Sequence, residues 1–368
     1  MPHFTTQDHI FMANALRLAK KGQYTAHPNP MVGCILAKNG KIIGEGWHKK
    51  TGTAHAEINA LEDAGEDAAG STAYITLEPC SQYGKTPPCF ESLIKAGIKK
   101  VITSIKDPSQ KFSGKGLESM QAAGIEVQYG LLSSAAEEIN RGFLMRVTKQ
   151  RPFVQLKLAI STDGAISMKN GESQWITGSS ARKDVQRLRA RSGAIMTGIG
   201  TLIRDNPMLN VREKTIETNG AQPIRVILDS NLRIPVNASM LKLSGKTLVC
   251  YKGKKDPQHL EDLNIEVKSF NSRDGFIDVS EVYSDLAKRG VNNLLVEAGP
   301  TLSGFLLEKK LVDEIVIYQA PHIMGSETIN FATTPTWRTL LDREEITITD
   351  TRRIGMDTRI TALFNGSK

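Results

Sequence analysis

The chain has 368 residues, of which 40% are hydrophobic and 23% charged, and its formal net charge is +8. This length suits about two domains that can each bury a core, and the composition is ordinary for a globular protein. No apolar run approaches the roughly 20 residues of a membrane-spanning helix, and the N-terminal stretch lacks a signal peptide's uninterrupted apolar segment. We therefore expect a cytoplasmic protein with no membrane partner, in which cysteine thiols stay reduced.

The positive charge is scattered along the chain. Lysine pairs are short and isolated, at 20–21, 49–50, 99–100, 254–255 and 309–310. A protein whose main partner is DNA or RNA is expected to carry a basic stripe. We therefore expect no nucleic-acid partner, and we interpret the charge as attraction for small phosphorylated substrates or a nucleotide cofactor. The alternative is a nucleic-acid-binding, base-modifying protein whose C-terminal half serves as a binding module.

Residues 1–148 predict a layered α/β domain built on one central sheet. A helix is expected over 6–21, with Thr5 or Thr6 as its N-cap. Asn39-Gly40 separates two β-prone runs and predicts a hairpin, because both residues tolerate the positive φ of a type I′ turn. Helices and strands then alternate through HAEINALEDAG, STAYITL (71–77), CFESLIKAG, KKVITSI, GLESMQAAG and IEVQYG, and a helix follows over 133–146.

Residues 149–368 predict a second α/β domain, which follows the basic, polar junction RVTKQRP. The last stretch, EITITDTRRIGMDTRITALF, alternates as an antiparallel terminal hairpin does. The chain contains no internal repeat. Strands are expected over 153–160, 194–199, 224–229, 247–251, 293–297 and 314–319, and helices near 179–192, 280–289 and 301–310.

Two of the four cysteines, Cys80 and Cys89, bracket a polar loop in TLEPCSQYGKTPPC. In a reducing compartment a disulfide is disfavoured, which leaves metal binding or simple burial. Upstream, His55 and Glu57 stand at the start of a predicted helix in TGTAHAEINAL. One nitrogen and two thiolates suit zinc, and a catalytic zinc site leaves its fourth position to water. His55, Cys80 and Cys89 are therefore candidate zinc ligands, with Glu57 beside the water.

This group of residues predicts hydrolytic deamination. Zinc lowers the pKa of a bound water to about 7, and a neighbouring carboxylate can pass the water's proton to a departing amine. Zinc deaminases share a His-x-Glu motif followed by Pro-Cys-x-x-Cys. Here His-Ala-Glu and Pro79-Cys80 agree, although eight residues separate the cysteines. The other two cysteines, Cys34 and Cys250, lie in apolar strand patterns and are expected to be buried.

Four motifs of the first half, AHPNPMVG, HAE, TLEPC and GKTPPC, resemble the deaminase half of the bifunctional riboflavin-biosynthesis deaminase/reductases. That family resembles cytidine deaminases in fold and has a long loop between its cysteines, as this chain does. The resemblance implies a cytidine-deaminase-like α/β/α domain with Glu57 as the catalytic residue. It also implies substrate contacts at Asn29, His48, Lys85 and Thr86, although His48 could instead be a solvated surface histidine.

The second half contains no G-x-G-x-x-G motif, so a Rossmann dinucleotide site is not supported. An apolar strand runs into AGPT and then a helix, where Gly299 and the first-turn amides form a candidate anion site. Strand–Gly–helix turns are also common in α/β proteins without any ligand. The segments KLAISTDGAIS, GESQWIT, GTLIRDNPMLNVR and EAGPTLSGF resemble the reductase half of the same family, which has a dihydrofolate-reductase-like α/β fold.

By that resemblance the second domain binds NADPH and a phosphoribosylated pyrimidine. Arg189 and Arg212 suit a ribose phosphate, because a guanidinium binds phosphate in a bidentate way. Trp175 could instead be a core residue, and Arg189 could lie on a solvated helix face. The implied NADPH contacts are Ala159, Trp175, Thr201, Asp205, Ser230, Gly299, Pro300, Thr301, Leu302, Ser303, Gly304 and Phe305. The implied substrate contacts are Lys157, Ser173, Arg189, Leu209, Arg212 and Glu297.

The two halves together imply a bifunctional enzyme of riboflavin biosynthesis with Zn²⁺ and NADPH as cofactors. The first domain would deaminate 2,5-diamino-6-(5-phosphoribosylamino)pyrimidin-4(3H)-one, and the second would reduce the ribose of 5-amino-6-(5-phosphoribosylamino)uracil to a ribityl chain. The resemblance also implies a homo-oligomer that forms through the reductase domain. In a weaker alternative, one half has lost its activity and only scaffolds the other.

Overall fold

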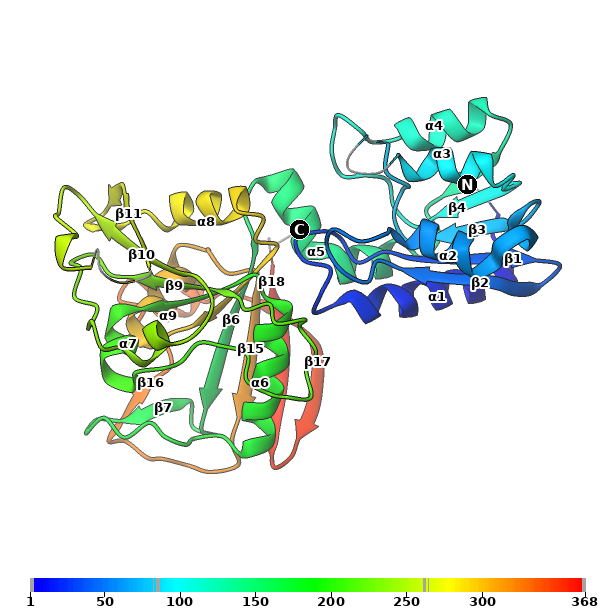
Figure 1. The fold of residues 1–368 in the computed structure, drawn as a ribbon. Coiled ribbons are helices and arrows are strands. Elements are labelled where there is room, and N and C mark those ends of the chain that lie inside the picture. Colours follow the sequence, from blue (N-terminus) through cyan, green and yellow to red (C-terminus); the bar gives the residue numbers. More distant parts are fainter. Residues whose placement is uncertain (1–2, 82, 84–86, 261–262, 264, 366–368) are drawn as a thin grey trace. The chain divides into compact units, whose positions relative to one another are not determined.

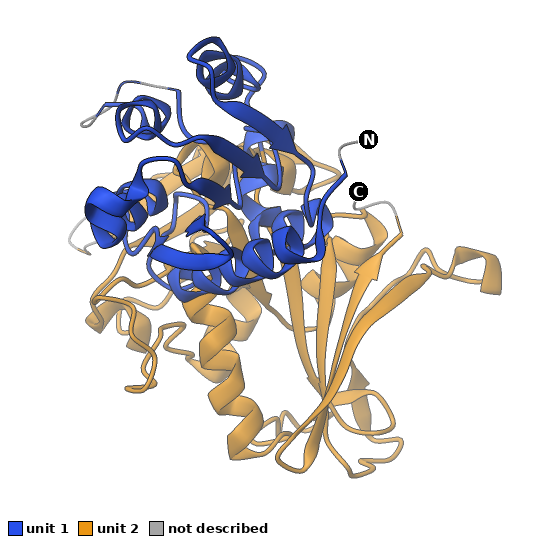
Figure 2. Cartoon of the chain, turned by 90° about the vertical axis from the view of Figure 1, so that its right-hand side faces the viewer, with its two compact units in different colours: residues 1–150 blue, residues 151–368 orange. Residues whose placement is uncertain are grey.

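The chain divides into two compact units, residues 1–150 and residues 151–368, which Figure 2 shows in different colours. The structure is a computed structural model, and no helix in the part of the chain that it describes is long and apolar enough to cross a membrane. The described residues are 3–81, 83, 87–260, 263 and 265–365.

Unit 1 is a five-stranded sheet in the order β2-β1-β3-β4-β5, covered by helices on both faces (Figure 1). Strands β3, β4 and β5 run parallel, and β1 is antiparallel to both of its neighbours. Its helices are α1 (Thr6–Ala19), α2 (Ala56–Ala64), α3 (Cys89–Lys95), α4 (Lys115–Ala122) and α5 (Ser133–Lys149), and its strands are β1 (Gly33–Lys38), β2 (Lys41–Trp47), β3 (Thr72–Ile75), β4 (Lys100–Thr103) and β5 (Glu126–Tyr129).

Strand β1 shows why the sheet needs cover on both sides. Cys34 and Leu36 join the core beneath α2, α3 and α4, whereas Ile35 and Ala37 join the core beneath α1 and α5. Successive side chains of a strand point to opposite faces, so a strand that is apolar throughout must be buried on both. The expected α/β/α layering of the cytidine-deaminase type is thereby confirmed, as is the burial of Cys34.

The local predictions for unit 1 hold at its turns and caps. Thr5 is the N-cap of α1, where its side chain accepts from the Asp8 N–H. Asn39 and Gly40 have φ of 52° and 74° at the β1–β2 turn, which confirms the predicted hairpin. Two helix ends differ, because α1 ends at Ala19 in a 3₁₀ turn and α5 continues to Lys149. Helix ends depend on tertiary contacts and are the least determined part of such a prediction.

Helix α2 lies against β2 at two glycines. A Cβ on Gly46 would lie 2.1 Å from the Ala56 carbonyl oxygen, and one on Gly44 would lie 2.4 Å from that of Ala60. Both distances are far below van der Waals contact, so only glycine allows this approach. The first turn of α2, directly after His55, is thereby held close to the sheet.

Unit 2 is built on a nine-stranded sheet in the order β11-β10-β9-β8-β14-β6-β15-β18-β17, with a separate buried core on each face. The helices are α6 (Ser179–Arg191), α7 (Ile199–Asp205), α8 (Val279–Lys288) and α9 (Pro300–Glu308). The strands are β6 (Phe153–Ile160), β7 (Ala165–Met168), β8 (Ala194–Gly198), β9 (Ile224–Leu228), β10 (Thr247–Lys252), β11 (Glu266–Phe270), β12 (Ser272–Arg273), β13 (Phe276–Ile277), β14 (Asn293–Glu297), β15 (Glu314–Gln319), β16 (Thr328–Asn330), β17 (Ile346–Ile354) and β18 (Asp357–Phe364).

The longer predicted elements of unit 2 are all present, and β17 and β18 form the expected terminal hairpin. The prediction missed helix α7, the edge strand β11 and the short strands β7, β12, β13 and β16. Strand β7 pairs with β16, which lies more than 150 residues further along the chain. Strands this short depend on their pairing partner, and local sequence carries little trace of it.

The substitution Gly46→Ala tests the contact between α2 and β2. The added methyl group would force α2 away from β2 and displace His55, so the variant should lose about 1–3 kcal/mol of unfolding free energy. Its zinc content should fall as well. Chemical denaturation and metal analysis measure the two effects. The control is Gly200→Ala in α7, where a Cβ meets no atom within 4 Å; equal stability and equal zinc content in both variants would contradict this account.

Candidate active sites

Three side chains from separate segments of unit 1 meet at the N-terminus of α2. The His55 Nδ1 lies 3.2 Å from the Cys89 Sγ and 3.6 Å from the Cys80 Sγ, and the two sulfurs are 3.4 Å apart. His55 directly precedes α2, Cys80 follows β3, and Cys89 is the first residue of α3. Among the residues that the structure describes, these three alone form a group that could hold a metal ion.

The geometry of this group fits zinc. Tetrahedral coordination, with Zn–S near 2.3 Å and Zn–N near 2.0–2.1 Å, places the ligand atoms about 3.5–3.8 Å from one another. The observed separations lie close to this range. The disulfide considered from the sequence is excluded, because both thiols are free and a sulfur–sulfur bond measures about 2.05 Å. The predicted zinc site is therefore supported.

The hydrogen bond between the two thiols favours ionisation of Cys80 and raises the pKa of Cys89. The hydrogen bond with Cys89 lowers the pKa of Cys80, and the backbone N–H of Cys89, at the start of α3, donates to the Cys80 sulfur at 3.3 Å. The hydrogen bond with Cys80 in turn raises the pKa of His55. A thiolate is the form of cysteine that binds zinc, and helix N-termini favour it.

Glu57 is a buried carboxyl beside this group. It lies in the first turn of α2, is 3% exposed, and forms a hydrogen bond with the Cys89 side chain. Burial raises the pKa of Glu57 to about 7. A carboxyl group with that pKa is populated in both protonation states at neutral pH, as a group that accepts and then donates a proton requires.

A third element of the site is a pair of polar side chains, Asn29 and His48. The Asn29 Nδ2 lies 3.1 Å from the His48 Nε2, and the His48 Nδ1 lies 3.2 Å from the Ala54 carbonyl oxygen. The His48 ring packs edge-on against His55, with centroids 5.3 Å apart. His48 is 3% exposed, so the alternative of a surface histidine is wrong. The other two expected contacts, Lys85 and Thr86, lie outside the described residues.

Glu78 is a buried carboxylate that the sequence analysis did not single out. It accepts backbone N–H bonds from Asp107 at 3.0 Å, Gly114 at 2.9 Å and Gly116 at 3.1 Å. Glu78 thereby joins the loop after β4 to the segment that continues into Pro79 and Cys80. Glu78 is part of the TLEPC motif, but the residues around that motif do not indicate hydrogen-bond partners 29–38 residues away.

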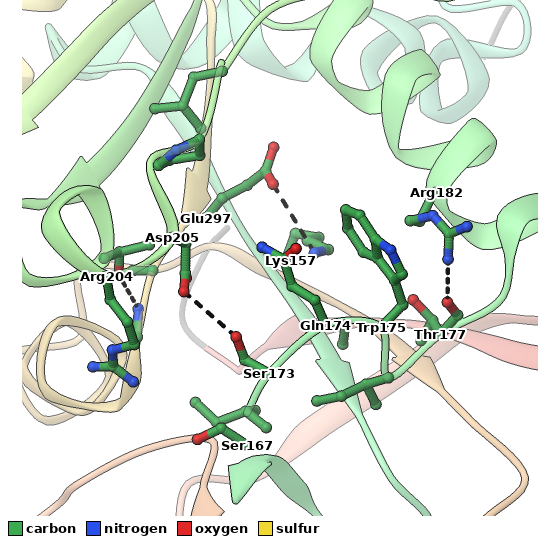
Figure 3. A pocket seen from close by; sticks show the side chains of 18 of the residues that line it. Lys157, Ser167, Ser173, Gln174, Trp175, Thr177, Arg182, Arg204, Asp205 and Glu297 are labelled. Carbon is green, nitrogen blue, oxygen red and sulfur yellow. Dashed lines mark hydrogen bonds and ion pairs between the residues drawn. The ribbon is translucent and has the colours of Figure 1, made fainter. Parts of the chain in front are cut away.

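Unit 2 holds a cavity of about 420 Å³ around a cluster of largely buried charges (Figure 3). Glu297 ends β14 and pairs in register with Lys157 of β6, whose Nζ lies 4.0 Å from the Glu297 carboxylate. Arg189 of α6 binds the same carboxylate through Nε at 2.7 Å and Nη2 at 3.1 Å. Eleven expected residues line this cavity: Lys157, Ala159, Ser173, Trp175, Arg189, Thr201, Asp205, Leu209, Arg212, Glu297 and Gly299.

The charges of this cluster stabilise one another. Burial raises the pKa of Glu297, but attraction to Arg189 and Lys157 outweighs burial and lowers it to about 2. Burial lowers the pKa of Lys157, and the Glu297 carboxylate opposes that effect. Arg189 is 8% exposed, so the alternative of a solvated helix face is wrong. A buried carboxylate that stays ionised needs such partners.

Another wall of the cavity comes from residues 173–177 together with Asp205 at the end of α7. The Ser173 hydroxyl lies 3.4 Å from an Asp205 carboxylate oxygen, as Figure 3 shows. Trp175 is 65% exposed, which excludes a core role, and the Arg182 guanidinium lies 4.5 Å from the centroid of its ring. The wall therefore presents an exposed aromatic ring, a hydroxyl and a carboxylate to the cavity.

A second cavity of about 350 Å³ adjoins the first, because both are lined by Thr201, Arg204 and Gly299. The Thr201 hydroxyl accepts the Gly299 N–H at 3.1 Å, which holds the start of α9 against α7. Arg204 was missed from the sequence, although it stands beside Asp205 in GTLIRDNPMLNVR. Seven expected residues line this second cavity: Thr201, Ser230, Gly299, Pro300, Thr301, Leu302 and Phe305.

Two expected residues of α9 do not line either cavity. Ser303 is fully buried, with its hydroxyl 3.4 Å from the Ala298 carbonyl oxygen. Gly304 faces the Thr333 backbone so closely that a Cβ would lie 1.8 Å from its carbonyl oxygen. The helical period turns these two positions into the protein, away from the cavities.

Comparison with known proteins finds relatives over nearly the whole chain. The model of the "Cytidine and deoxycytidylate deaminase zinc-binding region" matches residues 5–105, and the "RibD C-terminal domain" matches residues 152–357. The riboflavin biosynthesis protein RibD of Escherichia coli is 42% identical over 360 residues, 95% of this chain and 98% of the relative. RibD of Haemophilus influenzae is 45% identical over 374 residues, 98% of each chain.

Solved structures of related proteins are also similar to this chain. Acinetobacter baumannii RibD superposes with a TM-score of 0.91 at 40% identity, over 98% of this chain and 99% of that one. The Thermotoga maritima diaminohydroxyphosphoribosylaminopyrimidine deaminase/5-amino-6-(5-phosphoribosylamino)uracil reductase superposes with a TM-score of 0.85 at 31% identity and the same coverage. The expected fold of both halves is confirmed, and the chain belongs to the RibD family of bifunctional deaminase/reductases of riboflavin biosynthesis.

Proposed function

We propose that unit 1 hydrolytically deaminates 2,5-diamino-6-(5-phosphoribosylamino)pyrimidin-4(3H)-one and that unit 2 reduces the ribose of the resulting uracil with NADPH. The observation that carries the proposal is the triad of His55, Cys80 and Cys89 with the buried Glu57 beside it. Membership of the RibD family supports both activities, and the Thermotoga relative is described by both. A cytoplasmic location and a homo-oligomer formed through unit 2 stay predictions.

The deamination replaces a ring C–NH₂ group by C=O, with water consumed and ammonia released. His55, Cys80 and Cys89 would hold the zinc, which when bound supplies a water nucleophile at neutral pH. Glu57 takes the proton that the attacking water loses and delivers it to the departing amine. Its pKa near 7 suits both transfers, because neither state of the carboxyl is strongly favoured at neutral pH. Asn29 and His48 face the pyrimidine and orient it.

The reduction transfers a hydride to C1′ of an opened, imine-like ribose. NADPH, when bound, supplies that hydride, and the protein orients it against the sugar. The adjoining cavities suit such a pair of ligands, with the cofactor against Ser230 and α9 and the pyrimidine beside Glu297. Lys157 faces the reacting sugar carbon. Arg189 and Arg212 hold the ribose phosphate.

Arg212 carries more of the phosphate contact in this proposal than Arg189 does. Three N–H groups of Arg189 already donate to Glu297 and to the Asn210 carbonyl oxygen. Arg212 is exposed, and its Nη1 lies 3.3 Å from the Asn210 Oδ1. A guanidinium at the cavity edge can bind phosphate without giving up a buried ion pair.

Parallel assays of the wild-type protein and the variant Glu57→Gln test the deaminase proposal. Wild-type protein should contain zinc, release ammonia from the diaminopyrimidine without NADPH, and then consume NADPH. Glu57→Gln should keep its zinc and its NADPH oxidation on preformed uracil substrate, while ammonia release falls by about 10²–10⁴-fold. The control Glu62→Gln changes an exposed carboxylate of the same helix. Normal deamination by Glu57→Gln would refute its role, and a wild-type chain without ammonia release would refute the function.

The variant Arg212→Ala tests the phosphate site of unit 2. Loss of a charge-assisted contact should raise the KM for the phosphorylated uracil substrate by about 10- to 100-fold, and ammonia release by unit 1 should not change. The same variant should leave the KM for the dephosphorylated substrate unchanged. Arg187→Ala, a half-exposed arginine of α6, serves as the control. A similar loss on both substrates would show that Arg212 does not bind the phosphate.

A further inference from the structure

We infer that Asn140 and Thr51 are positioning residues that hold the substrate-binding Asn29 from two sides. The segment concerned is residues 25–32, between α1 and β1, and is named here the Asn29 loop. The inference rests on the role proposed for Asn29 in orienting the pyrimidine. Asn140 lies outside the motifs that carry the zinc chemistry and Thr51 stands four residues before His55, and each contacts the backbone of the loop.

Asn140 reaches the loop from α5. Its Oδ1 accepts the Met31 N–H at 2.8 Å, and its Nδ2 donates to the Met31 carbonyl oxygen at 2.8 Å. Asn140 is 3% exposed, so both bonds are shielded from water. One amide that binds both polar groups of a single residue fixes its position and its orientation. The two residues are 109 positions apart in the chain, and Met31 is two positions after Asn29.

A second contact from the same helix lies one residue before Asn29. The Arg146 Nη2 donates to the Pro28 carbonyl oxygen at 3.3 Å. Helix α5 has 17 residues and ends at Lys149, so Asn140 and Arg146 are carried by one rigid element. The helix therefore holds the loop on both sides of Asn29.

Thr51 holds the preceding part of the loop from a different segment. Its hydroxyl lies 2.6 Å from the Ala26 carbonyl oxygen and 2.9 Å from that of His27. The Asn29 N–H donates to the same Ala26 carbonyl at 2.9 Å, which closes the turn. The Thr51 hydroxyl thus holds the two carbonyl groups of the turn that leads into Asn29.

The position of the loop decides how Asn29 faces the zinc site. Asn29 contacts His48, and the ring of His48 packs on the zinc ligand His55. The His48 N–H also donates to the Val32 carbonyl oxygen at 2.9 Å. Polar recognition of a small ring tolerates displacements of only about 0.5 Å. Loosening the loop should therefore weaken substrate binding, while the zinc ligands and Glu57, on other segments, stay in place.

The decisive variant is Thr51→Val, which removes the hydroxyl at an exposed position with little change in side-chain volume. It should raise the deaminase KM by about five- to tenfold and leave kcat within about threefold. Zinc content and NADPH-dependent reduction of preformed uracil substrate should not change. The matched control is Thr53→Val, because the Thr53 hydroxyl donates to the Lys50 carbonyl oxygen at 2.7 Å in the same turn.

Asn140→Ala removes both bonds to Met31 and should raise the KM by about 10- to 100-fold with zinc retained. If this buried substitution prevents folding, Thr51→Val decides alone. An unchanged KM in Thr51→Val, an equal change in Thr53→Val, or a fall in kcat at constant KM would overturn the inference. A wild-type chain that binds zinc but releases no ammonia would instead refute the proposed function, and the inference with it.

Discussion

The structure depends on one constraint, which is that ionisable groups buried in each site must find partners in the folded chain. A charge moved from water into a protein interior costs several kcal/mol unless other groups replace the lost solvation. Glu57 and Glu78 are buried and Glu297 is largely buried, and each meets this constraint in a different way. Their surroundings account for most of what the two units can do.

The three carboxyl groups differ in what surrounds them. Glu78 accepts three backbone N–H groups, so it organises a loop. Glu297 is surrounded by cationic side chains, which lower its pKa to about 2 and keep it ionised at any physiological pH. For Glu57, burial outweighs a backbone hydrogen bond and the attraction to His55, and its pKa rises to about 7. Identical carboxyl groups thus become a scaffold, a fixed charge and a proton carrier.

Close packing gives these groups their positions. In unit 1 the glycines of β2 let α2 approach the sheet, and the first turn of that helix carries Glu57 beside the zinc ligands. In unit 2 the register between β6 and β14 places Lys157 opposite Glu297. In both units a strand or helix end presents the reactive group, while the sheet behind it is buried on both faces. Rigid elements of this kind can hold a site to within a fraction of an ångström.

The sequence by itself determined the features that depend on neighbouring residues. The cap at Thr5, the Asn39-Gly40 hairpin, the long strands and the motif around His55 and Glu57 all follow from short-range stereochemistry or fixed ligand spacing. Resemblance to a known family added the predicted cofactor and substrate contacts of the reductase domain. Most of them line the two cavities, whereas two positions of α9 face inward.

Only the tertiary structure decided the long-range contacts. The sequence does not show that Asn140 pairs with Met31, that Glu78 binds the loop after β4, or that Arg189 is buried against Glu297. Each of these polar groups is satisfied by a partner far away in the chain, and many other residues could offer the same donors and acceptors. The packing of helices on the sheet selects among them, because it determines which groups are brought together out of water.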